Sequence, residues 1–318
     1  MQTKEKKPHF RYQPVLLLGF ILLIFVFCGC ASNDKSRIQR VDKNDMPPVS
    51  TEFPDEVFDK KFPEMTGDEY ERLGDTLLRR GKLHIAYLQY ERSLKVNPNN
   101  LRAEYKKGLA LLLRKKNDAA IEQFYVVLEK DRNFALAYEG IGRALLDKKK
   151  YSEAEINFQK TLQINPALWK SHNFLGNIYD FQKKFEKAIW AYKSALTIRP
   201  NNGSLYNNLG VSYNLTGNFK EAVHSFNKAI DLKYTRSKVY NNLGLAYANL
   251  EQYSKALQAF KQGGEMAQAY NNLGCIYLKK GMFEEAVHCF EKAIELEPGF
   301  YATANENLKK IKAGKGQL

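Results

Sequence analysis

The sequence predicts an all-α fold, a right-handed α-solenoid of about seven helix-turn-helix repeats with a C-terminal capping helix. The first observation is the pentapeptide YNNLG, which occurs at residues 206–210, 240–244 and 270–274. The second is a period: one glycine recurs every 34 residues, with a last interval of 30, at Gly74, Gly108, Gly142, Gly176, Gly210, Gly244 and Gly274. A fixed period of this length is typical of stacked structural repeats rather than of a single active site.

Each unit contains two apolar patterns of helical spacing. In residues 203–236, Leu209 and Tyr213 belong to the first pattern, and Ala222 and Phe226 belong to the second, after a break at residues 216–218. An alanine follows each periodic glycine by 12 residues and an aromatic residue follows it by 16. Small residues let two helices cross closely, and the aromatic side chain fills the space beside the crossing. Such short helix pairs are marginal alone and become stable by stacking.

This pattern resembles the tetratricopeptide repeat family over residues 67–300. The fifth repeat has the family's residues in order, with Tyr234 in place of the closing proline: Tyr206, Leu209-Gly210, Tyr213, Ala222, Phe226 and Ala229. We divide the chain into repeats 67–100, 101–134, 135–168, 169–202, 203–236, 237–266 and 267–300, followed by a capping helix and tail at 301–318. The sixth repeat is four residues shorter than the others, and Gly263-Gly264 is expected to end its second helix in the left-handed conformation.

The N-terminus is typical of an exported bacterial protein. A basic segment precedes an apolar run of 14 residues from Val15 to Cys28, which is short for a membrane span and suitable for a signal peptide. The sequence around Gly29-Cys30 resembles a bacterial lipobox, which implies a lipoprotein signal peptide at 1–29 and lipidation of Cys30. An uncleaved anchor and a cleaved, soluble periplasmic form remain alternatives. Residues 30–66, polar and with four prolines, are expected to be a flexible linker after the lipidated cysteine.

The net charge of +14 favours partners with an anionic surface. Basic residues gather at the turn inside each of the first four repeats, where stacking would place them along one edge. This basic ridge comprises Arg79, Arg80, Lys82, Arg114, Lys115, Lys116, Lys148, Lys149, Lys150, Lys183 and Lys184. They are either ordinary solvated turns or a surface for phospholipid head groups or an acidic partner. Nucleic acid is not an expected partner of an exported protein.

Asparagines recur at the two positions before Leu-Gly, although Asn is a poor helix former. They are Asn173, Asn207, Asn208, Asn241, Asn242, Asn271 and Asn272. The family resemblance implies that this helix face lines a concave groove, where an exposed amide could bind the backbone of a peptide segment. The alternative is that a recent repeat was duplicated and the asparagines were merely retained.

We find no phosphate-binding loop, zinc-protease motif or nucleophile elbow. His172 and Asp180 are possible acid/base groups, but single polar residues on helices are ordinary. The sequence therefore predicts a non-enzymatic scaffold for protein–protein interactions, with no cofactor and no metal site. The combination of lipid signal and repeats is similar to that of type IV pilus biogenesis and envelope-adaptor lipoproteins, which implies a lipid-anchored protein on the periplasmic side of the outer membrane. A periplasmic adaptor of a cell-wall enzyme and a surface-exposed binding protein are the alternatives.

Overall fold

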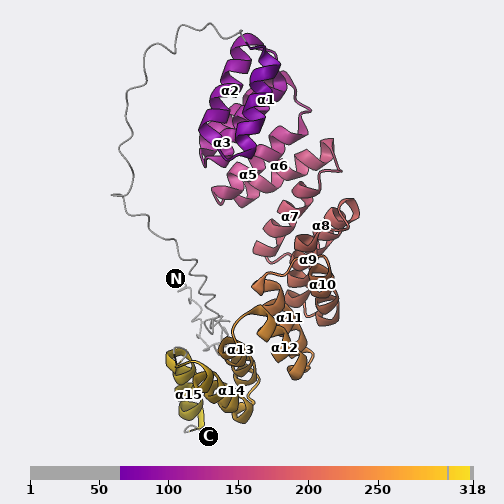
Figure 1. Ribbon diagram of the computed structural model, residues 1–318. Coiled ribbons are helices and arrows are strands. Elements are labelled where there is room, and N and C mark those ends of the chain that lie inside the picture. The colour runs from indigo at the N-terminus through magenta and orange to yellow at the C-terminus, as the bar shows by residue number, and fades with distance from the viewer. Residues whose placement is uncertain (1–64, 299–300, 316–318) are drawn as a thin grey trace, which may run out of the picture. The chain divides into compact units, whose positions relative to one another are not determined.

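The computed structural model describes residues 65–298 and 301–315. The predicted signal peptide, Cys30 and nearly all of the predicted linker lie outside the described residues. Within the described part the chain forms only α-helices (Figure 1). They are α1 Gly67–Arg79, α2 Leu83–Val96, α3 Leu101–Leu113, α4 Asn117–Lys130, α5 Ala135–Asp147, α6 Tyr151–Ile164, α7 Trp169–Phe181, α8 Phe185–Ile198, α9 Gly203–Leu215, α10 Phe219–Asp231, α11 Ser237–Asn249, α12 Tyr253–Gly263, α13 Met266–Lys279, α14 Phe283–Leu296 and α15 Tyr301–Lys315.

The helices pack in sequence order, as expected for an all-α solenoid. Each odd-numbered helix packs on the next helix of its own pair, and each even-numbered helix packs on the first helix of the following pair. Odd-numbered helices also contact one another across repeats, in the pairs α3–α5, α7–α9, α9–α11 and α13–α15, whereas the described even-numbered helices form no comparable contacts among themselves. Successive odd-numbered helices are therefore closer together, and they form what we call the inner face of the stack.

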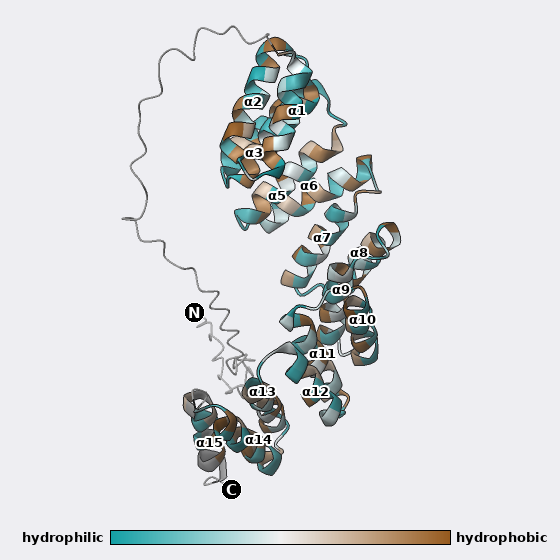
Figure 2. Ribbon diagram, in the orientation of Figure 1, coloured by the Kyte–Doolittle hydropathy of each residue, from teal (hydrophilic) through white to brown (hydrophobic). Residues whose placement is uncertain are grey.

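The periodic glycines lie where the two helices of a pair cross. A Cβ atom added to Gly176 would lie 2.4 Å from the Tyr192 ring, and one added to Gly142 would lie 2.9 Å from the Phe158 ring. These two aromatic side chains are almost completely buried. The predicted role of the glycine and the aromatic residue is therefore confirmed at these crossings. Figure 2 shows that the helices carry hydrophobic and hydrophilic residues side by side, as amphipathic helices must when they stack.

The turn inside each repeat contains one residue in the left-handed conformation. Glycine occupies this position in three repeats, with φ of 73° at Gly81, 79° at Gly217 and 75° at Gly281. Lysine occupies it in the second, third and fourth repeats, with φ of 61° at Lys115, 61° at Lys149 and 59° at Lys183. A side chain with a Cβ atom is strained in this region, so these lysines cost stability that glycine would not.

We expect Lys149→Gly to stabilise the protein by about 0.5–1 kcal/mol, because glycine adopts the left-handed conformation without the Cβ clash. Urea unfolding followed by circular dichroism measures the change. The matched control is Lys150→Gly, one residue later, where φ is −87° and glycine offers no such relief. A loss of stability in Lys149→Gly would contradict the strain argument.

The sixth repeat has a shortened second helix, as expected from a repeat that is four residues shorter than the others. Helix α12 has 11 residues and ends at Gly263. A Cβ atom on Gly263 would lie 2.7 Å from Oδ1 of Asn241, so glycine permits α12 to approach α11 closely. The predicted left-handed end of this helix is wrong: Gly264 is extended, with φ −177° and ψ −160°. Gly263 therefore serves close packing of α11 and α12 rather than a left-handed turn.

Helix α15 packs on α14 and α13 and buries Ala304, Asn307 and Ile311. It covers the apolar surface that the seventh repeat would otherwise expose at the end of the stack. In the part of the chain that the structure describes, each helix is too short or too polar to span a membrane.

Candidate functional site

The basic ridge residues lie in the turns between the two helices of each pair, and some of them are ion-paired. Nζ of Lys115 lies 2.8 Å from Oδ2 of Asp147, and Lys148 pairs with Asp118, so the turns of the second and third repeats are tied to each other. Lys150 pairs with Glu153 in its own helix, at 3.0 Å. These three lysines are less available to a partner than the sequence alone suggested.

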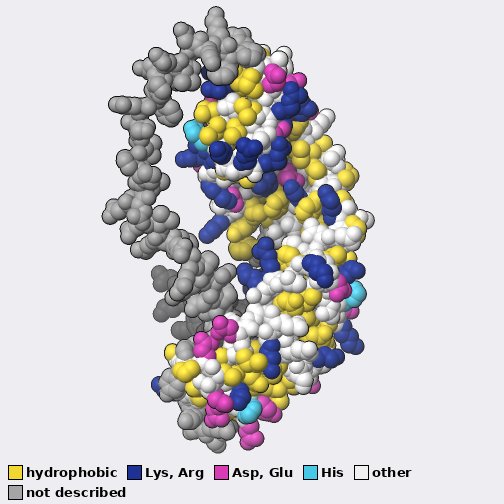
Figure 3. Space-filling view, in the orientation of Figure 1, with side chains coloured by type: hydrophobic (Ala, Val, Ile, Leu, Met, Phe, Trp, Pro, Cys, Tyr) yellow, Lys and Arg dark blue, Asp and Glu magenta, His cyan; other side chains and the backbone are white. Residues whose placement is uncertain are grey.

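The other ridge residues have no carboxylate partner among the described residues, and all but the half-buried Arg114 are exposed. The guanidinium of Arg114 lies 5.8 Å from the centre of the Tyr87 ring. Figure 3 shows Lys and Arg side chains over the first repeats, in the upper part of the view. The unpaired, exposed members are Arg79, Arg80, Lys82, Lys116, Lys149, Lys183 and Lys184.

The asparagines on the inner face connect neighbouring repeats. Nδ2 of Asn208 on α9 donates to Oδ1 of Asn173 on α7, at 3.1 Å. Nδ2 of Asn207 donates to Oδ1 of Asn208 at 3.3 Å, so the three amides form a chain. In the Asn-Asn pair of α9, the second residue therefore bonds backward to the preceding repeat. One copy of the pentapeptide thus makes a contact between neighbouring helices, a structural role that the sequence analysis did not consider.

The same two helix positions hold a charged pair at the start of the solenoid. Glu71 on α1 is equivalent to Asn173, and Lys106 on α3 is equivalent to Asn208. Nζ of Lys106 lies 2.7 Å from Oε1 of Glu71 and 2.6 Å from Oδ2 of Asp75. Asn100 donates to Glu71 at 2.7 Å. Burial alone would raise the pKa of Glu71, but the hydrogen bonds from Lys106 and Asn100 hold that pKa below its usual value.

The expected exposure of the asparagine series is wrong at its C-terminal end. Asn271 and Asn272 on α13 are buried, with 1% and 6% of their surface exposed. Asn241 is half-buried beside Gly263. The sequence could not show this, because burial at these positions depends on how closely the shortened α12 approaches its neighbours. Asn173, Asn207, Asn208, Asn241 and Asn242 remain half-buried at the inner face.

The two possible acid/base residues are held in structural contacts. Asp180 accepts hydrogen bonds from Ser212 at 2.8 Å and from Tyr192 at 2.9 Å, which tie α7 to α8 and α9. Burial raises its pKa, although both bonds favour the ionised carboxylate. A ring nitrogen of His172 lies 3.0 Å from the carbonyl oxygen of Pro166, and burial lowers the pKa of this histidine. Among the described residues, no group of three potential metal ligands is present.

Exposed apolar side chains on the inner face are a feature that our sequence analysis missed. Phe181 and Leu215 each follow a periodic glycine by five residues, and they are 63% and 49% exposed. Leu245 on α11 is 42% exposed. The polar side chains near them in sequence are mainly amides, such as the exposed Asn177 and Asn249. The signal was present in the sequence as apolar residues outside the predicted core pattern, at the fifth position after the glycine for Phe181 and Leu215 and at the first for Leu245.

Comparison with known proteins agrees with this architecture. Models of the tetratricopeptide repeat match residues 71–134, 135–168, 203–235, 237–263 and 267–300, and a further repeat model matches 176–217. Together these matches cover most of the chain. No curated protein sequence matches.

Three solved structures illustrate the likeness. A tetratricopeptide repeat protein from Parabacteroides merdae is 17% identical, with 77% of this chain and 98% of that chain covered and a TM-score of 0.51. The MamA protein is 27% identical over 53% of this chain and 92% of its own, with a TM-score of 0.45. YrrB, described as a TPR protein with an unusual peptide-binding site, is 23% identical over 58% and 97%, with a TM-score of 0.49. The family models and the helix-pair packing lead to one conclusion: the chain belongs to the tetratricopeptide repeat family.

Proposed function

We propose that this protein is a non-enzymatic scaffold of the bacterial cell envelope that binds a segment of another protein on its inner face. The observation that carries the proposal is the row of exposed apolar side chains on α7, α9 and α11. Leu215 and Leu245 are 49% and 42% exposed, and Phe181 is 63% exposed although one face of its ring stacks on Tyr151. Large apolar side chains exposed at the surface of a repeat stack are suited to binding a partner.

The half-buried asparagines would supply the polar part of this groove. Asn173, Asn207 and Asn208 are joined in a chain of hydrogen bonds, which fixes the orientation of their amides. An amide held in this way can still offer its remaining donor or acceptor to a peptide backbone. The groove would therefore prefer an uncharged segment with apolar anchors. Asn241 and Asn242 extend the same surface, whereas Asn271 and Asn272 are too deeply buried to contribute.

The basic ridge would orient the scaffold against an anionic surface. Lys149 and Lys183 are exposed and have no ion-pair partner among the described residues, and each occupies a strained position that glycine fills in other repeats. A cation near an anionic membrane contributes roughly 1 kcal/mol. The double variant Lys149→Gly, Lys183→Gly should therefore be more stable than the wild type and bind anionic vesicles more weakly at low salt.

The envelope location rests on Gly29-Cys30 after the short apolar run, and we propose lipidation of Cys30 as the anchor. Such a tether would hold the scaffold on the periplasmic side of the outer membrane, where it would assist assembly of a pilus, secretion or other envelope complex. A periplasmic adaptor for a cell-wall enzyme and a surface-exposed binding protein use the same anchor and groove.

We expect cells fed a fatty-acid analogue to label the wild-type protein and to leave Cys30→Ala unlabelled. Cys28→Ala is the matched control and should be labelled like the wild type, because Phe27 before Cys28 is too large for the cleavage position. Gel fluorescence of the purified proteins measures the outcome. Labelling of Cys30→Ala would refute the assignment of Cys30, and an unlabelled wild type would refute the lipid anchor.

A further inference from the structure

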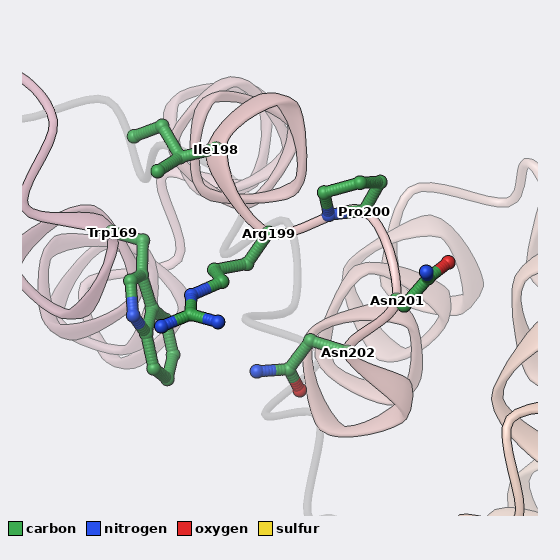
Figure 4. A pocket seen from close by; sticks show the side chains of 6 residues that line it. All are labelled: Trp169, Ile198, Arg199, Pro200, Asn201 and Asn202. Carbon is green, nitrogen blue, oxygen red and sulfur yellow. The ribbon is translucent and has the colours of Figure 1, made fainter.

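A pocket lies in the connection between the fourth and fifth repeats, away from the row of apolar side chains described above. It has a volume of about 460 Å³. Trp169 at the start of α7 forms one wall, and the α8–α9 connection forms the other with Ile198, Arg199, Pro200, Asn201 and Asn202. Figure 4 shows the Arg199 guanidinium pointing into the space between the Trp169 ring and the Asn202 amide.

Two departures from the repeat pattern distinguish this site. In the first three repeats, the position of Arg199 holds Asn97, Asp131 and Asn165, and each side chain accepts the backbone N–H two residues later, at 3.2, 2.8 and 3.0 Å. The oxygens of these side chains are therefore engaged in hydrogen bonds within their own loops. An arginine cannot accept such a bond, so its guanidinium is free of the loop and reaches the pocket.

The second departure is the size of the residue that begins the repeat. The first three repeats start with Gly67, Leu101 and Ala135, whereas the fourth starts with Trp169. Trp169 is half-buried and packs against the central core, so its ring is a fixed wall. The large aromatic residue and the free arginine occur together at this one connection among those that the structure describes.

The polar lining of the pocket has one positive charge, the Arg199 guanidinium, and no negative charge. No carboxylate among the described residues lies within ion-pairing distance of Arg199, and none of the residues lining the pocket is acidic. Oδ1 of Asn202 accepts the backbone N–H groups of Ser204 and Leu205, at 3.1 and 3.3 Å, which leaves the amide NH₂ as a donor. Nζ of Lys170 lies 5.9 Å from the centre of the Trp169 ring and adds a second positive charge.

We propose that this pocket binds a carboxylate carried next to an aromatic or large apolar group. The Arg199 guanidinium would bind the carboxylate with two parallel hydrogen bonds, and the Asn202 amide would donate a third. The Trp169 ring and the Ile198 side chain would pack against the apolar part. The volume suits a single residue or a small organic acid. Such a carboxylate comes either from a free small acid or from the C-terminal residue of a protein chain.

Trp169 is a built-in reporter, because the chain has two tryptophans. In Trp190→Phe it is the single tryptophan, and its fluorescence can be followed while N-acetylphenylalanine is added. We expect a saturable change, and at least tenfold weaker binding of the uncharged N-acetylphenylalaninamide. In the same background, Arg199→Gln should weaken binding of the acid at least tenfold and Arg199→Lys less. Melting temperatures should not change, because Arg199 is exposed.

The matched control is Arg236→Gln in the next connection, where the guanidinium lies 5.4 Å from the centre of the Tyr234 ring. It should bind the acid like its parent. A peptide ending in a phenylalanine carboxylate would bind more tightly than the single residue if the source is a protein C-terminus, and no more tightly if the source is a small acid. Equal binding of acid and amide, unchanged binding in Arg199→Gln, binding of acetate as tight as that of N-acetylphenylalanine, or absence of saturation would each overturn the proposal.

Discussion

Replacing Phe158 by alanine should destabilise the protein by about 3–5 kcal/mol, the usual cost of removing a buried aromatic side chain. Phe158 is completely buried, and its ring stacks on Phe174 with the ring centres 5.0 Å apart. On its other side it packs against Gly142, which has no side chain that could fill the cavity. Because the site lies in the third repeat, the loss weakens contacts on both sides of it. Urea unfolding followed by circular dichroism measures the effect.

Phe181→Ala is the control for this substitution. Its side chain is 63% exposed and stacks on Tyr151 with ring centres 4.1 Å apart. We expect a loss below about 1 kcal/mol, since surface substitutions remove little packing. If Phe158→Ala unfolds at nearly the same urea concentration as the wild type, packing of the aromatic residue at the helix crossing does not stabilise the stack.

Replacing Lys106 by methionine should cost about 2–4 kcal/mol at pH 7, because it leaves the buried Glu71 carboxylate without its cation. Nζ of Lys106 contacts both Glu71 and Asp75, and the Glu71 side chain is only 5% exposed. The amide of Asn100 would remain as a partner of Glu71, together with the more distant guanidinium of Arg102 at 3.5 Å. These contacts compensate in part, so we expect destabilisation rather than loss of the fold.

The effect of Lys106→Met on stability should depend on pH, in a direction set by the ionisation of Glu71. In the wild type the pKa of Glu71 is held below its usual value, so its stabilising contribution is present above about pH 4.3 and is lost as the pH falls through the folded-state pKa. In Lys106→Met, the cation that opposes the effect of burial on the Glu71 pKa is absent. Protonation of Glu71 at low pH then removes the cost of burying a carboxylate without its cation. The difference in melting temperature between the two proteins should therefore shrink from pH 7 to pH 3.5. A constant difference would mean that Lys106 acts through packing alone. Glu71→Gln combined with Lys106→Met should recover part of the stability at pH 7.

The periodic residues predicted the fold well because they act within one repeat. Gly176 and Tyr192 touch inside a single helix pair, so their spacing in sequence is enough to predict their contact. The all-α solenoid follows from repetition of that contact. The position of the turns was also predicted correctly, since a glycine stands there in several repeats and Lys115, Lys149 and Lys183 take the same backbone conformation.

The asparagines were harder to interpret because their partners lie in the neighbouring repeat. Asn208 bonds to Asn173 across 35 positions of sequence, and only stacking brings the two together. An alignment of Glu71 with Asn173 and of Lys106 with Asn208 would have shown two complementary pairs at the same two positions. Burial of Asn271 and Asn272 depends on how closely the helices pack after the shortened sixth repeat. That packing cannot be predicted from the two asparagines or from their neighbours in sequence.

We propose that the exposed apolar residues on the inner face bind a protein segment, whereas the hydrogen bond from Asn208 to Asn173 joins the fifth repeat to the fourth. A displayed library of random peptides, selected on the full chain, provides ligands, and their affinities for variants then separate the two roles. Leu113→Ser is the matched control, because Leu113 lies five residues after its glycine, is 41% exposed, and belongs to the second repeat.

The deciding measurement compares peptide affinity and melting temperature in the double variant Leu215→Ser, Leu245→Ser and in Asn208→Ala. We predict that the leucine variant melts like the wild type and binds the selected peptides at least about tenfold more weakly, since each lost apolar contact contributes roughly 1 kcal/mol. Asn208→Ala should melt lower, by the loss of about 1 kcal/mol for its bond to Asn173. Peptides that bind the leucine variant as tightly as the wild type would contradict the account, as would an Asn208→Ala protein that melts unchanged.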